Sequence, residues 1–124
     1  MSFFEQAAKA YDIMGVVLQN QGDYDSAYYY YNRALSIKKN LDIPRLLAES
    51  LNNFGVLNRR QGRYDSALSC YHQALDIAIK AGDSLLIGNY INNIGLVLEN
   101  KEEYTEAIVF HINSLILSEA LGDS

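Results

Sequence analysis

The sequence predicts an all-α solenoid made of three helix–turn–helix repeats, which together supply six antiparallel helices. Two observations support this prediction. The 124 residues repeat themselves with a period of 40, and the apolar residues inside each repeat recur every three or four positions, as they do along one face of a helix. A helix pair that keeps an apolar flank must stack on another pair, and this stacking makes a solenoid.

The period needs no insertion or deletion. Glycines recur at positions 15, 55 and 95, tyrosines at 24, 64 and 104, alanines at 27, 67 and 107, and leucines at 35, 75 and 115. We therefore expect one domain, residues 1–124, with repeats at about 5–44, 45–84 and 85–124. Whether this domain is a fragment of a longer array stays open.

The second repeat shows how each unit divides into two helices. Its first apolar run recurs at Leu47, Leu51 and Phe54. Gly62 then suits the left-handed residue that ends a helix, and Asp83 or Ser84 suits the N-cap of the next repeat. The same reading along the chain predicts helices at about 5–20, 24–40, 44–60, 64–80, 84–100 and 104–120.

Small residues at fixed positions predict close helix packing. A glycine inside a helix costs about 1 kcal/mol relative to alanine, so three glycines at one register need a reason. We expect Gly15 to let the first helix of its repeat approach Ala27 in the second. Ala74 is expected to receive Ile91 from the following repeat.

The same residues carry a family resemblance. The second copy reads Ala48, Leu51, Phe54-Gly55, Gln61-Gly62, Tyr64-Asp65, Ala67, Tyr71 and Ala74-Leu75. This pattern closely resembles a tetratricopeptide repeat, and the first copy carries it as well. The third copy departs from it at Glu102, where a turn glycine is expected, and at His111 and Ser114, which replace an aromatic residue and an alanine. His111 is expected to be a packed histidine.

The resemblance implies a right-handed superhelix and a protein–protein interaction module that binds an extended peptide in a concave groove. The 40-residue period, longer than the family's usual 34, resembles the variety found in signalling scaffolds and bacterial regulators. A peptide-sensing regulatory domain of a larger signalling protein is therefore one alternative function.

The groove implied by the resemblance would be lined by the first helix of every repeat. If Met14, Phe54 and Ile94 face the core, the residues beside that stripe, three and four apart, face the groove. The predicted groove residues are Lys9, Asp12, Glu49, Asn52, Asn53, Val56, Arg59, Arg60, Asn89, Asn92, Asn93 and Leu96.

Asn53 and Asn93 are the principal candidates within this set. A side-chain amide offers two donors and an acceptor, so it can pair with the backbone of an extended peptide whatever the peptide's sequence. Ile13 holds the corresponding place in the first repeat. The alternative is that these asparagines only hydrogen-bond between helices or face water.

Arg59, Arg60 and Arg63 form the only basic cluster. Guanidinium groups bind carboxylates in a bidentate manner, so we hypothesise that Arg59 and Arg60 attract an acidic peptide. Equally, they could be solvated charges stabilised by the dipole at a helix C-terminus.

Composition excludes several other functions. A net charge of −5, from 10 basic and 15 acidic residues, argues against nucleic acid as a partner. No apolar run reaches the roughly 18 residues of a membrane span, and no secretory signal is visible, so we expect a cytoplasmic protein without a membrane partner. No catalytic or metal-binding motif is present, and Cys70 is expected to be a buried structural thiol. We therefore expect no enzyme, no cofactor and no metal.

Two apolar features remain. The segment from Ala107 to Leu121 is apolar around most of its circumference, which predicts self-association through the last helix as an alternative function. In the run Tyr28–Tyr31, Tyr31 is expected to pack between helices and the other rings to lie scattered on the surface. The alternative is that these rings form an aromatic contact patch on the outer face.

Overall fold

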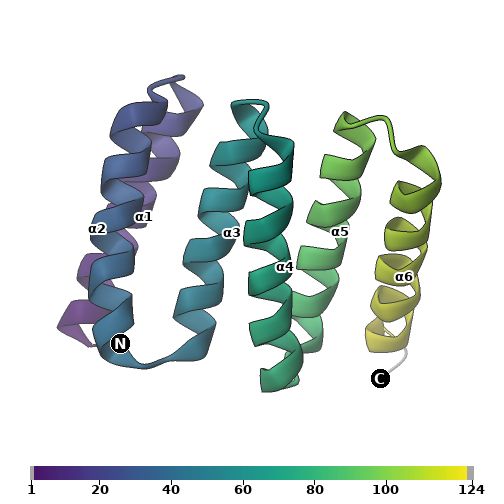
Figure 1. Ribbon diagram of the computed structural model, residues 1–124. Helices are drawn as coiled ribbons and strands as arrows, with labels where there is room; N and C mark the ends of the chain where they lie inside the picture. The colour runs from purple at the N-terminus through teal and green to yellow at the C-terminus, as the bar shows by residue number, and fades with distance from the viewer. Residues whose placement is uncertain (1, 123–124) are drawn as a thin grey trace.

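The computed structural model describes residues 2–122 and contains six helices in a single curved row (Figure 1). The helices are α1 (Phe3–Asn20), α2 (Tyr24–Leu41), α3 (Pro44–Arg60), α4 (Tyr64–Ala81), α5 (Ser84–Asn100) and α6 (Tyr104–Gly122). All six predicted helices are confirmed, although α1 begins two residues earlier and α6 ends two residues later than expected. Residues 123–124 of the third predicted repeat lie outside the described part of the chain.

No helix within residues 2–122 combines the length and the apolar character that a membrane crossing requires.

The helix ends follow the local chemistry that the sequence predicts. Asp83 caps α5, because its Oδ1 accepts a 3.1 Å hydrogen bond from the backbone N–H of Leu86. Gly62 takes the left-handed conformation between α3 and α4, with φ at 77°. In the third repeat Glu102 takes the same conformation, with φ at 63°, although it carries a side chain.

Within each repeat, the glycine of the first helix makes room for a ring from the second. A Cβ built on Gly15 would lie 2.5 Å from Cε1 of Tyr31, and one built on Gly55 would lie 2.5 Å from Cε1 of Tyr71. Both tyrosine side chains are fully buried. The predicted close contact is thus present: the ring of Tyr31 lies against Gly15, and Ala27 on the same helix is fully buried.

Between repeats, the second helix of one unit packs on the first helix of the next. Ala67 and Tyr71 of α4 share a buried cluster with Ile94 and Val97 of α5. In a second cluster of this interface, Ala74 packs with Tyr90 instead of the predicted Ile91. Interfaces within a repeat alternate with interfaces between repeats, so the buried core runs continuously along the row of helices.

The first helix departs from the predicted register of buried residues. Met14 was expected to face the core with Phe54 and Ile94, but 42% of its surface is exposed, whereas Ile94 is fully buried. The difference arises because α4 precedes and covers α5, whereas no described helix precedes α1. The apolar face of α6 is likewise exposed.

Candidate functional site

The first helices of the three repeats share one hollow, on the face where the resemblance places the concave groove. The hollow measures about 430 Å³, and α1, α3 and α5 all contribute to its lining. Its lining residues are Asp12, Glu49, Asn52, Asn53, Leu86, Asn89, Tyr90, Asn92 and Asn93. Seven of the twelve predicted groove residues therefore come together in one place.

Side-chain amides dominate this surface. The Nδ2 group of Asn93 donates a 2.7 Å hydrogen bond to Oδ1 of Asn52, which ties α5 to α3. This bond uses one donor of Asn93 and one lone pair of Asn52, so both amides keep further bonding capacity toward the hollow. Asn53 is half-buried, and its side-chain amide makes no hydrogen bond to any described residue. One bond between helices, the alternative raised from the sequence, thus coexists with amides that remain available.

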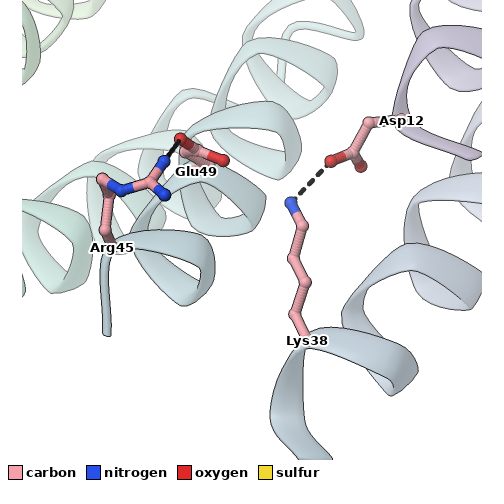
Figure 2. A network of polar contacts seen from close by, with 4 residues as sticks. All are labelled: Asp12, Lys38, Arg45 and Glu49. Atoms are coloured by element: carbon pink, nitrogen blue, oxygen red, sulfur yellow. Dashed lines mark hydrogen bonds and ion pairs between the residues drawn. The ribbon is translucent and has the colours of Figure 1, made fainter. Parts of the chain in front are cut away.

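Two ion pairs lie at the α1 end of the hollow, and Figure 2 shows their side chains pointing toward each other. The ammonium group of Lys38, only 2% exposed, pairs with Oδ2 of Asp12, which is 16% exposed. The guanidinium of Arg45 binds Oε1 of Glu49 at 2.7 Å, and both of these side chains are exposed. Lys9 lines an adjoining hollow of about 160 Å³ together with these four residues.

Lys38 is a site residue that the sequence reasoning missed. It stands at the register of Ala78, which is buried in the second repeat, so a lysine there has to find a partner or remain unpaired in the protein interior. Asp12 supplies that partner from α1. The other carboxylate oxygen of Asp12, Oδ1, is buried and has no hydrogen-bond partner among the described residues.

The remaining predicted groove residues do not line the central hollow. Arg59 and Arg60 lie in the last turn of α3, and the positive charge of Arg59 acts on the phenol of Tyr71. Burial raises the pKa of the Tyr71 phenol, and Arg59 partly offsets this shift. Val56 is half-buried and packs against the core between α4 and α5, while Leu96 is more exposed.

His111 takes the place in the third repeat that tyrosine holds in the other two. Its ring is half-buried and packs against Gly95, as the expectation of a packed histidine requires. Its Nδ1 lies 3.1 Å from Oδ1 of Asn92, and its Nε2 lies 2.8 Å from Oε1 of Glu99. His111 therefore orients Asn92 at the edge of the hollow.

Other potentially reactive groups do not converge. Cys70 is half-buried rather than fully buried, and burial raises the pKa of its thiol, while a hydrogen bond from Asn58 works in the opposite direction. Across residues 2–122, no three His, Cys, Asp or Glu side chains gather as a metal site would require. The chemistry of the hollow is thus that of hydrogen bonding.

The sequence profile of the tetratricopeptide repeat family matches residues 5–80 and 42–111. The chain belongs to the tetratricopeptide repeat family. Among curated proteins, none matches this TPR chain significantly by sequence. The resemblance noted from the sequence is confirmed.

Solved structures share the TPR fold at low sequence identity. BtubC from P. vanneervenii superposes with a TM-score of 0.83 at 21% identity, covering 94% of this chain and 48% of its own. Aspartyl phosphate phosphatase F from Bacillus subtilis gives 0.90 at 19% identity, covering 98% and 32%. The TPR domain of Arabidopsis FLU gives 0.82 at 18% identity, covering 94% and 98%. The chain thus spans about half of BtubC and about a third of the phosphatase.

Proposed function

We propose that the concave face of α1, α3 and α5 binds an extended segment of a partner protein. Tetratricopeptide repeats are in general protein–protein interaction modules, and the chain belongs to that family. The observation that carries the proposal for this chain is the row of five asparagines lining a single hollow across α3 and α5.

The chemistry of this row suits a peptide backbone. An extended segment presents N–H and C=O groups at regular intervals, and each needs a partner once water is excluded. Asn53 has all of its bonding capacity free, whereas Asn52 and Asn93 use only part of theirs on each other. Their mutual hydrogen bond also fixes the orientation of both amides before a peptide arrives, which reduces the entropic cost of binding.

The hollow does not support the hypothesis of an acidic peptide. That hypothesis relied on Arg59 and Arg60, which lie outside the lining residues, and the charged groups inside the lining are Asp12 and Glu49. Both carboxylates have cationic partners, Lys38 and Arg45. We therefore propose that recognition in the hollow operates mainly through the peptide backbone.

The experiment is a selection of linear peptides from a random display library on the immobilised chain, followed by calorimetric titration of the selected peptide. We expect the Asn53→Ala/Asn93→Ala double variant to weaken binding by at least tenfold, because about 1 kcal/mol is lost for each amide–backbone contact. Asn40→Ala, at an exposed asparagine on α2, serves as the matched control and should leave the affinity unchanged.

Equal affinity of the double variant and the unmodified chain would reject the groove as the binding site. Circular dichroism and urea unfolding of both variants separate a loss of contacts from a loss of fold. An Arg59→Ala/Arg60→Ala variant tests the hypothesis of an acidic preference in the same titration, and its affinity is expected to stay within twofold of the unmodified chain.

A further inference from the structure

The two ends of the helix row expose apolar faces of different kinds. On α6, Tyr104, Ile108 and Leu115 are exposed by 59%, 57% and 59%, respectively. On α1, Met14 and Val17 are exposed by 42% and 50%. Helix α1 belongs to the first repeat of the row and α6 to the last (Figure 1), and both apolar faces are exposed within residues 2–122.

Helix α4 is the equivalent of α6 in the preceding repeat, and the same face of α4 packs against the next helix. The residues 40 positions earlier are Tyr64, Leu68 and Leu75 of α4. All three are half-buried, and they pack against the core cluster that contains Ile94 and Val97 of α5. The exposed face of α6 is therefore the register equivalent of the surface with which α4 holds α5.

The exposed face of α1 matches the other half of that contact. Met14 and Val17 stand 80 positions before Ile94 and Val97, both of which are fully buried in a cluster with Ala67 and Tyr71 of α4. At the intermediate position in α3, Leu57 is buried in a cluster with Ala27 and Tyr31 of α2. Helix α1 thus presents the face that α3 and α5 each turn toward the preceding helix.

We propose that two copies of this chain associate head to tail, with α1 of one copy seated on α6 of the next. The contact repeats the α4–α5 interface between molecules instead of within one. Because it joins two different faces, it is heterologous, and it extends into short rows instead of closing on a symmetric dimer. It does not involve the hollow on the concave face, so it is independent of the proposed peptide binding.

One register position indicates that the contact is reversible. Tyr90 fills the space over Ala74 and Ala78 in the α4–α5 interface, whereas its counterpart in α1 is Ala10. The corresponding contact between copies therefore lacks one aromatic ring. We expect an association that increases with concentration and dissociates on dilution, as weak interfaces do.

The test uses sedimentation of three chains over a range of concentrations. The average mass of the unmodified chain should rise above its 13.9 kDa with concentration. Variants Met14→Asp/Val17→Asp and Ile108→Asp/Leu115→Asp should each remain monomeric, because each lacks one face. An equimolar mixture should associate again, because each variant supplies the face that the other has lost, and its mass should level off at twice that of one chain.

Each other outcome overturns the proposal. A monomeric unmodified chain at every concentration would do so, as would self-association of either variant alone, which would indicate like faces pairing. A mixture that stays monomeric contradicts it too. Gln73→Asp, at an exposed position on α4, adds a negative charge away from both faces; as the control, it should associate as the unmodified chain does. A second pair of variants with serine in place of aspartate repeats the test if circular dichroism shows a loss of helix.

Discussion

Gly55 on α3 lies directly beneath the ring of Tyr71 on α4, so close that a Cβ on the glycine would come within 2.5 Å of Cε1. The ring is fully buried and shares a cluster with Ile94 of α5, so it cannot move aside without disturbing the next repeat. The contact at Gly55 therefore connects packing within a repeat to packing between repeats.

We predict that Gly55→Ala destabilises the fold. Overpacking a well-filled core costs about 1–3 kcal/mol, and the higher helix propensity of alanine returns about 1 kcal/mol. The urea midpoint should fall. Gly88→Ala on α5 is the matched control, because its Cβ would meet Leu117 Cδ2 at an ordinary 3.4 Å, and its midpoint should rise. A Gly55→Ala variant at least as stable as the unmodified chain would contradict the packing argument.

The Lys38–Asp12 pair gives a second prediction. Replacing Lys38 with methionine leaves the Asp12 carboxylate in a largely buried position without its cation, which should lower the free energy of unfolding by about 3 kcal/mol. Adding Asp12→Asn to the same chain should recover part of this loss, and urea unfolding of the full double-mutant cycle measures how much.

Arg45→Met is the control for this prediction. It removes the exposed pair with Glu49 and should change stability by less than about 1 kcal/mol. Equal effects of Lys38→Met and Arg45→Met would show that burial of the first pair is unimportant.

Alkaline pH should destabilise the chain through two tyrosines. Burial raises the pKa of Tyr31 and of Tyr90 from 10.0 to about 12. Since the folded chain holds these protons more tightly than the unfolded chain, their stabilising effect is complete below pH 10 and is lost as the pH rises toward 12. Urea unfolding at pH 8, 10 and 11 measures the loss, which should be smaller in Tyr31→Phe. If Tyr31→Phe loses stability with pH as steeply as the unmodified chain, ionisation of Tyr31 is not the cause.

Cys70 should react slowly with alkylating reagents. The thiolate is the reactive form, and burial raises the pKa of this thiol, so less thiolate is present at pH 8 than in an unfolded chain. We expect iodoacetamide to modify Cys70 faster in urea than in buffer. Asn58→Ala should slow the native reaction further, since the hydrogen bond from Asn58 lowers the thiol pKa. A native rate equal to that in urea would contradict this account.

The sequence predicted the positions of all six helices because the 40-residue period aligns each apolar stripe with two others, and because glycines mark the turns of the first two repeats. It was less reliable about contact partners. The small size of Gly15 indicated close packing, but spacing alone did not show that the ring of Tyr31 lies against this glycine.

Two further residues show why the 40-residue period alone did not predict which side chains are buried. Met14 shares the register of Ile94 but is exposed, because a repeat pattern treats every copy alike, whereas burial depends on the neighbouring helix. Nothing in the sequence distinguishes Lys38 from an ordinary solvated charge, and its burial depends on Asp12, 26 residues away on another helix. All five asparagines that line the hollow were predicted, because they follow the core stripe at helical spacing.

The central claim is that a partner segment lies along the concave face of α1, α3 and α5. Nuclear magnetic resonance mapping of the selected peptide on the ¹⁵N-labelled chain tests it most directly, because the side-chain amides of asparagine give their own signals. The account predicts the largest shifts at the amides that line the hollow, led by Asn53 and Asn93. Shifts confined to α2, α4 and α6, with both of these amides unmoved, would contradict it.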